Sequence, residues 1–226
     1  MSIEYIKENY NRVLNDIEKA AGDRDVTLVC VTKSGTDEEL LALAALGVTD
    51  IGENRPQELR RRADLLRTHG YTPRLHEIGN LQRGNVKYIV GDVALIHSVD
   101  SLPLGERIGQ LAKAQGRVVP VLVEVNSAGE EQKGGVSPDG AEALCTLLSG
   151  IEGISVRGIM TMGPRVSDPE ELRPYFRQTK QLFDRLKTAG RFDGDGILSM
   201  GMSSSFAVAI EEGATLVRVG TRLFEN

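Results

Sequence analysis

Two hydrophobic periods alternate along the 226-residue chain. Short runs rich in β-branched residues, typical of buried strands, are separated by stretches in which apolar side chains recur every three or four positions, as in an amphipathic helix. The eight runs that predict strands are residues 27–33, 49–54, 74–79, 94–100, 119–126, 154–162, 196–202 and 215–220. The clearest helical stretches are 37–47, 57–70 and 169–190, and the last ends at Gly190, a residue type common at helix ends.

This alternation predicts an α/β fold: a single (β/α)₈ TIM-type barrel with an extra N-terminal helix, in one domain over residues 1–226. Eight parallel strands can close on themselves without leaving an edge. The opening helix, about Ser2 to Ala21, precedes the first strand and little chain follows the eighth, so we expect it to cover the gap where a long final helix would lie. The alternative, an open doubly wound sheet, is less favoured because Ser34-Gly35-Thr36 lacks the G-x-G-x-x-G pattern after the first strand.

Composition and charge narrow the class of protein. Hydrophobic residues make up 40% of the chain and charged residues 26%, the profile of a globular protein. The 27 basic and 32 acidic side chains give a formal charge of −5. This balance argues against nucleic-acid binding, because such proteins carry a clustered basic face. The nearest candidate for one, Arg60-Arg61-Arg62, lies in a polar helix pattern, and we expect all three side chains to face solvent.

The cysteines and the N-terminal segment indicate the compartment. Cys30 and Cys145 are far apart and lack C-x-x-C spacing, so we expect neither a disulfide framework nor a metal site, and a reducing environment. The start of the chain is charged throughout, unlike the apolar core of a signal peptide. No run approaches the roughly 18 apolar residues of a membrane span. These features predict a cytoplasmic protein that works without a membrane.

Lys33 is the first candidate for chemistry. The carboxyl ends of barrel strands carry the working face, and Lys33 follows the apolar run 29–32. Its side chain is either a surface amine, which position alone favours, or an amine held in a partly dry mouth. A desolvated lysine has a lowered pKa and can attack an aldehyde, as a Schiff base requires. Cys30 has the opposite strand parity, so we expect it to face the helices.

The loops after the last two strands have the composition of phosphate sites. Small residues and hydroxyls fill 199–205, where they offer free backbone N–H groups, although an ordinary serine N-cap gives the same pattern. On the eighth strand, alternation puts Arg218 and Gly220 on one side, and Thr221 offers a hydroxyl beside Ser203. Two such loops in adjacent positions, together with Lys33, predict a site for a phosphorylated aldehyde.

Other polar residues at strand ends are Asn54, His76, His97 and Asn126. Each is either a binding residue or a rim group satisfied by its neighbours. His69 lies near the end of a helical stretch, which favours a role in capping a carbonyl.

Several segments together resemble the pyridoxal phosphate homeostasis proteins. They are VTK (31–33), IGENRPQEL (51–59), H-x-I-G-x-L-Q (76–82), IHSVDSL (96–102), VEVN (123–126), RGIMTMGP (157–164), LSMGMS (198–203) and VRVGTRLF (217–224). They follow one another in the family's order from the first strand to the C-terminus. The resemblance implies the barrel of the alanine racemase N-terminal domain, without that enzyme's second domain, and pyridoxal 5′-phosphate as cofactor.

The resemblance also implies roles for individual residues. Lys33 is expected to form the internal aldimine with C4′ of the cofactor. An arginine such as Arg218, facing the pyridine nitrogen, keeps that nitrogen unprotonated and so weakens carbanion chemistry. The cofactor phosphate is expected on Ser203, Gly220 and Thr221, while Asn54, His76 and Met200 occupy family pocket positions.

The function implied is non-catalytic: the family binds pyridoxal phosphate, buffers it and delivers it, so that apo-enzymes dependent on it are the expected partners of a monomeric carrier. The chain departs from the family at Glu77, Gly84, Asn85, Ser204 and Ser205, and we expect several of these positions near the mouth of the barrel. They reflect either drift or a redesigned pocket. The alternative function is therefore a barrel enzyme that uses Lys33 or Glu77, or a weak racemase.

Overall fold

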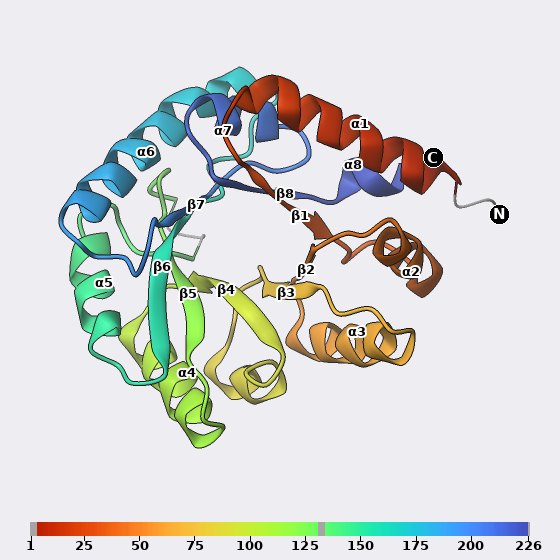
Figure 1. Ribbon diagram of the computed structural model, residues 1–226. Coiled ribbons are helices and arrows are strands. Elements are labelled where there is room, and N and C mark those ends of the chain that lie inside the picture. The colour runs from red at the N-terminus through yellow and green to blue at the C-terminus, as the bar shows by residue number, and fades with distance from the viewer. Residues whose placement is uncertain (1–3, 131–133, 226) are drawn as a thin grey trace.

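The computed structural model describes residues 4–130 and 134–225, and its strands form one closed parallel barrel in the order β1 to β8 (Figure 1). The strands are β1 (Thr27–Val31), β2 (Asp50–Glu53), β3 (Arg74–Glu77), β4 (Val93–Val99), β5 (Val119–Glu124), β6 (Ile154–Met160), β7 (Ile197–Ser199) and β8 (Leu216–Val219). β1 pairs with β8 as well as with β2, so the barrel predicted from the sequence is confirmed and the open sheet is wrong.

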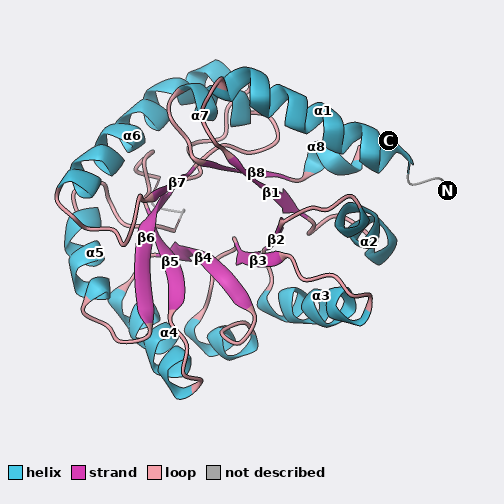
Figure 2. Cartoon of the chain, in the orientation of Figure 1, coloured by secondary structure: helices cyan, strands magenta, loops and turns pink. Residues whose placement is uncertain are grey.

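The helices form a ring outside the strands (Figure 2). They are α1 (Glu4–Ala21), α2 (Asp37–Ala45), α3 (Pro56–Thr68), α4 (Leu102–Ala114), α5 (Ala141–Ser149), α6 (Arg173–Thr188), α7 (Phe206–Glu211) and α8 (Thr221–Phe224), with 3₁₀ turns η1 (Arg83–Tyr88) and η2 (Pro169–Leu172). After α6, Gly190 adopts a positive φ of 66°, in agreement with its predicted role as a helix stop. Within residues 4–130 and 134–225, none of these helices has the length and apolar character needed to cross a bilayer.

Strand alternation separates two apolar layers. Outward side chains such as Cys30 and Ile51 pack in the large core between barrel and helices, as predicted for Cys30. Inward side chains form a smaller cluster inside the barrel, made of Val29, Leu95, Leu122, Met160 and Leu216. Both cysteines are buried free thiols, and burial raises the pKa of Cys145 to about 12. The inside of the barrel is therefore packed with side chains.

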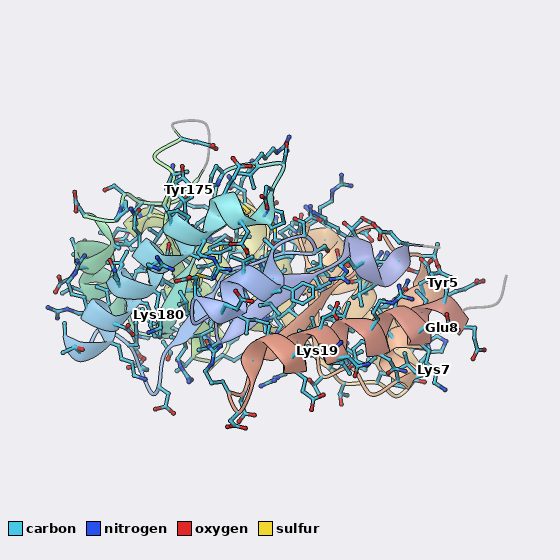
Figure 3. All side chains as sticks on the ribbon, turned by 90° about the horizontal axis from the view of Figure 1, so that it is seen from above. Tyr5, Lys7, Glu8, Lys19, Tyr175 and Lys180 are labelled. Atoms are coloured by element: carbon cyan, nitrogen blue, oxygen red, sulfur yellow. The ribbon has the colours of Figure 1, made fainter. Side chains whose placement is uncertain are left out.

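Helix α1 covers the gap beside the short α8, as the sequence predicted. Its buried residues lie three or four positions apart on one stripe, which contacts α7 and α8. Asn9 on this stripe donates from Nδ2 to the carbonyl oxygens of Leu223 and Glu225, at 3.4 and 2.6 Å. Figure 3 labels Lys7, Glu8 and Lys19 on the exposed side of the helix. The amino-terminal helix thus takes the place of a long helix after β8.

The backbones of β6 and β7 approach each other closely at Gly158. It pairs with Ile197 and has a φ of 151°, and a Cβ atom there would lie 2.0 Å from the Ile197 carbonyl oxygen. We expect Gly158→Ala to lower the free energy of unfolding by about 2 kcal/mol, because the strands would have to separate. Gly84, where an added Cβ has no neighbour within 4 Å, is the control, and Gly84→Ala should change it by less than about 0.5 kcal/mol. Urea unfolding followed by circular dichroism measures both, and equal values for the two variants would contradict the prediction.

Candidate functional site

One cavity of about 650 Å³ opens at the carboxyl ends of the strands. Its walls come from the segments that follow β1, β2, β3, β6, β7 and β8. The lining residues are Val31, Lys33, Asn54, Ile78, Met162, Met202, Ser203, Ser204, Arg218, Gly220, Thr221, Arg222 and Glu225. Lys33, Asn54, Ser203, Arg218, Gly220 and Thr221, which the sequence singled out, therefore meet in one place.

Lys33 lies two residues beyond the end of β1, in an exposed turn. The strand was expected to continue to Lys33, but its ladder ends where Thr32 donates its N–H to the Gly52 carbonyl. Arg62 of α3 holds the turn from below: its Nη1 donates to the Thr32 carbonyl at 2.5 Å and its Nη2 to the Gly35 carbonyl at 2.7 Å. The backbone on both sides of Lys33 is thus fixed by one guanidinium.

That guanidinium is neutralised by a buried carboxylate. Arg62 Nη1 lies 2.7 Å from Glu53 Oε1, and the Thr32 hydroxyl donates to the same oxygen at 2.5 Å. Desolvation raises the pKa of Glu53, and the Thr32 hydrogen bond and the charge of Arg62 oppose that rise. The ion pair and its hydrogen bonds are the contacts that make a buried charge tolerable.

The expectation that residues 60–62 all face solvent was wrong for Arg62, whose exposed fraction is 6%. Arg60 and Arg61 are exposed. Arg62 belongs instead to the buried stripe of α3, three residues after Leu59 and four before Leu66. That spacing was readable in the sequence and could have identified Arg62 as an inward cation that needs a partner.

The loops after β7 and β8 are joined by a hydrogen bond. The Gly220 N–H donates to Ser203 Oγ at 3.1 Å. Ser205 closes the β7 loop, since its Oγ accepts from the Met202 N–H at 3.1 Å and its own N–H donates to the Met202 carbonyl. Within the described residues, no acceptor is recorded for the backbone N–H groups of Ser203 and Thr221. The arrangement leaves N–H and hydroxyl donors free for an anion.

Arg218 points into the barrel, the direction that the family resemblance implied, and its exposed fraction is 4%. Its Nη1 donates to Ser199 Oγ at 2.5 Å and its Nη2 to the Thr161 carbonyl at 3.1 Å. Burial lowers the pKa of Arg218 to about 10, and the charge of Glu124 opposes that shift. The side chain is therefore a cation at neutral pH, held at the floor of the cavity.

His76 and Met200, which were expected in the pocket, do not line this cavity. Met200 is fully buried in the core between barrel and helices. His76 lies in the barrel interior, where its Nε2 is 2.8 Å from Asp50 Oδ1 and its Nδ1 is 3.0 Å from His97 Nε2. Side chains alternate along a strand, so Met200, which follows the inward Ser199, points outward. His76 points inward, but it lies within β3, below the carboxyl end of that strand.

His97 continues this line of polar side chains toward the cavity. Its Nδ1 lies 3.0 Å from Ser199 Oγ, the atom that Arg218 also contacts. Burial, with the charge of Arg218, lowers the pKa of His97 well below that of an ordinary histidine. Burial also opposes ionisation of Asp50, but hydrogen bonds from His76 and two neighbouring side chains outweigh it and hold the pKa of Asp50 at about 2. A neutral imidazole thus lies between a buried cation and a buried anion.

Two further expectations concern polar residues away from the cavity. Asn126 lies outside it, and its Nδ2 donates to the Glu130 carbonyl at 2.8 Å while its Oδ1 accepts from the Glu130 N–H. His69 ends α3, and its Nδ1 lies 2.9 Å from the Leu65 carbonyl oxygen, in agreement with the predicted capping role.

The positions that depart from the family mostly lie away from the cavity. Of these, Ser204 alone is a lining residue. Ser205 is buried behind the β7 loop, and Gly84 and Asn85 lie in η1. One of these five positions, Ser204, therefore contributes a side chain to the cavity.

Glu77 is fully buried and does not line the cavity. It follows the inward His76 on β3, so its carboxyl group points outward, where Oε1 accepts from the Gly79 N–H at 3.0 Å. No partner is recorded for Oε2 among the described residues. Desolvation raises the pKa of Glu77 to about 8, with a contribution from Glu53. The raised pKa favours the neutral acid near pH 7, and its place outside the cavity lining argues against a role as a base there.

Comparisons with known proteins agree with this geometry. The family model that describes the alanine racemase N-terminal domain matches residues 2–225. A pyridoxal phosphate homeostasis protein of Aquifex aeolicus is 40% identical over 222 residues, which cover 96% of each chain. The structure of an unknown protein from Bifidobacterium adolescentis has a TM-score of 0.91 and 36% identity, covering 98% of this chain and 95% of that one. PipY of Synechococcus elongatus, solved with PLP bound, has a TM-score of 0.85 and 29% identity, covering 97% and 100%.

We expect Arg62→Met to lower the free energy of unfolding by about 3 kcal/mol, because it leaves the Glu53 carboxylate buried without its cation. The turn that carries Lys33 should also exchange its amide hydrogens faster. Arg61→Met is the matched control on the same helix: the Arg61 side chain is 46% exposed and pairs with Asp37 at the surface, so its loss should cost less than about 1 kcal/mol. Urea unfolding and hydrogen exchange measure the two effects. Equal losses in the free energy of unfolding for the two variants would contradict the prediction that Arg62 fixes this turn.

The buried carboxyl of Glu77 predicts a dependence of stability on pH. Below its ordinary pKa of 4.5, Glu77 is neutral whether the chain is folded or unfolded; between 4.5 and about 8 only the folded state keeps the proton. The contribution of Glu77 to stability therefore falls as pH rises through this window, by at most about 1.4 kcal/mol per pH unit.

Glu77→Gln removes this titration, so the variant should gain stability over the wild type as the pH of urea unfolding is raised from 5 to 8. Glu152→Gln, which changes a carboxylate 72% exposed in its side chain, is the control and should show a constant difference. A constant difference for Glu77→Gln as well would mean that Glu77 ionises normally.

Proposed function

The chain belongs to the pyridoxal phosphate homeostasis protein family, and from that premise we propose that it binds pyridoxal 5′-phosphate on Lys33 as a non-catalytic carrier. The observation that carries the proposal is the meeting of one lysine amine with the free donors of two loops in a single cavity. The carrier would keep the cofactor available inside the cell, act as a monomer and deliver the cofactor to apo-enzymes that depend on it.

The residues present suit the chemical groups of the cofactor. Ser203, Gly220 and Thr221 would hold its phosphate: Ser203 and Thr221 offer hydroxyls and free backbone N–H groups, the donors that phosphates accept from, and Gly220 lets the backbone approach closely. Asn54 and Ile78 line the wall that continues from Lys33, and they offer one amide and one apolar contact to a planar ring. A cavity of about 650 Å³ has room for such a molecule.

Lys33 would fix the cofactor covalently. Its Nζ is the amine that lines the cavity, and the cofactor would supply the aldehyde to which an amine can bond. Arg62 supports this step indirectly, because it fixes the Thr32 and Gly35 carbonyls on either side of Lys33. A fixed turn lowers the entropy lost when the lysine side chain is ordered.

Arg218 supports a carrier rather than a catalyst. A cationic guanidinium toward the pyridine nitrogen would disfavour a proton there, and the ring acts as a strong electron sink only with that proton. Racemisation would also need an acid–base group on each face. Among the residues that line the cavity, Glu225 is the one carboxyl group beside Lys33, and no tyrosine, histidine or cysteine accompanies them.

Absorbance after addition of pyridoxal 5′-phosphate and desalting tests the proposal. We expect the wild type to retain an imine band near the visible edge and Lys33→Ala to lose it, since only an amine forms the double bond. Lys113→Ala, which changes a surface lysine paired with Glu152, should keep the band. Pyridoxal without its phosphate should bind at least tenfold more weakly, because the loop donors then have no partner.

A colourless wild type would contradict cofactor binding. Solvent deuterium entering Cα of added alanine would contradict the absence of catalysis, because exchange there requires a working acid–base pair.

A further inference from the structure

A line of buried polar side chains crosses the barrel from its amino-terminal end to the cavity. It starts at Asp50 on β2 and passes through His76 on β3 and His97 on β4 to Ser199 on β7 and Arg218 on β8. All five residues are buried, with exposed fractions of 4% or less. At the far end, Asp50 Oδ2 accepts from the exposed Arg74 at 2.7 Å. The line therefore joins the bottom of the barrel to the floor of the cavity.

We infer that these side chains form a hydrogen-bond chain with a single direction, which orients Arg218 for the cofactor. Asp50, His76, His97 and Ser199 are then positioning residues that act through Arg218. The inference rests on the proposed function, in which Arg218 faces the pyridine nitrogen.

The direction follows from donor and acceptor counts, beginning at Asp50. An ionised carboxylate can only accept, so His76 Nε2 carries a hydrogen and donates to it. We take His76, like His97, to be neutral: its one N–H is used on Asp50, which leaves a lone pair on His76 Nδ1. The nitrogen 3.0 Å away, His97 Nε2, must then be the donor.

The same rule continues to the cavity. With its hydrogen on Nε2, His97 presents a lone pair from Nδ1 and accepts from the Ser199 hydroxyl at 3.0 Å. Ser199 Oγ, having donated its hydrogen, accepts from Arg218 Nη1. Every hydrogen along the line thus points from Arg218 toward Asp50, and each donor has one acceptor.

This order stabilises both buried charges. Each neutral link turns its lone pair toward the Arg218 cation and its hydrogen toward the Asp50 anion, so the aligned dipoles strengthen one another. Ser199 Oγ and the Thr161 carbonyl together accept hydrogen bonds from both terminal nitrogens of Arg218. A guanidinium has five N–H donors in a fixed plane, so fixing two of them sets where the others point.

A metal site is the other use of one aspartate and two histidines. Among the described residues, however, no three His, Cys, Asp or Glu side chains are grouped to hold an ion. Asp50, His76 and His97 contact one another in sequence instead of facing a common point. Their geometry is that of a relay of hydrogen bonds.

The histidine tautomers can be measured without cofactor. The chain has three histidines, so ¹⁵N-edited NMR of the imidazole rings resolves each one. We expect His76 and His97 both to be neutral with the hydrogen on Nε2. His69 is the internal reference, because its Nδ1 lies 2.9 Å from a carbonyl oxygen that can only accept. A hydrogen on Nδ1 of either His76 or His97 would overturn the direction of the chain.

Ser199→Ala removes the link next to Arg218, and Ser199→Thr keeps the hydroxyl as a matched control. In Ser199→Ala we expect the His97 Nδ1 signal to shift, the affinity for pyridoxal 5′-phosphate to fall roughly tenfold, and the position of the imine band to change. Ser199→Thr should restore all three toward wild type. Circular dichroism verifies that both variants are folded.

The two proposals can fail separately. If the wild type took up no cofactor while both histidines had the expected tautomer, the proposal of cofactor binding would be wrong, but the direction of the hydrogen-bond chain would be confirmed. If the wild type bound the cofactor but Ser199→Ala matched it in affinity, band position and His97 signal, the positioning role would be wrong, but the proposal of a cofactor carrier would be supported.

Discussion

Strand β1 pairs with β8 in a register that runs from Thr27 opposite Leu216 to Cys30 opposite Val219. This pairing joins the two ends of the sheet, and the cavity depends on it. It sets Lys33, just after the first strand, beside Gly220 and the segment that begins α8. The fit is close, because a Cβ atom on Gly220 would lie 3.0 Å from the Val31 carbonyl oxygen. Residues from opposite ends of the chain therefore share one wall only because the barrel closes.

Two buried ionic systems support this wall from different sides. Outside the barrel, Arg62 and Glu53 hold the turn of Lys33. Inside it, Arg218 is held by Ser199 and Thr161 at the cavity floor. Buried charges seldom stabilise a fold more than apolar side chains of similar size would. Buried charges on both sides of the cavity wall are typical of a site whose geometry matters.

The sequence predicted the strands well because each apolar run had a clear period and a turn on either side. It placed their carboxyl ends less well: β1 ends at Val31 and β7 at Ser199, each earlier than expected. These ends carry the residues of the candidate site, where the backbone leaves the ladder to form loops. A pattern of residue types does not record which N–H groups lose their partners there.

Alternation also decided how far individual residues could be predicted. From parity alone it put Arg218 on the same side of β8 as Gly220 and gave the outward direction of Cys30. It could equally have placed Met200 outward, but the motif that contains Met200 suggested the pocket instead. Arg62 was missed because three consecutive arginines resemble a solvated face, although its spacing from Leu59 matches the buried stripe.

By itself, the sequence determined the barrel and the strand that carries each candidate, and it predicted a set of side chains for a phosphorylated aldehyde. These depend on the local period of the apolar residues and on the chemistry of individual residues, both of which can be read from the sequence. Tertiary structure alone decided that His76 contacts Asp50 and His97, that Arg62 contacts the turn of Lys33, and that Glu77 is buried on the outer face. Those contacts join strands and helices distant in sequence, and only the register and curvature of the closed barrel fix their distances.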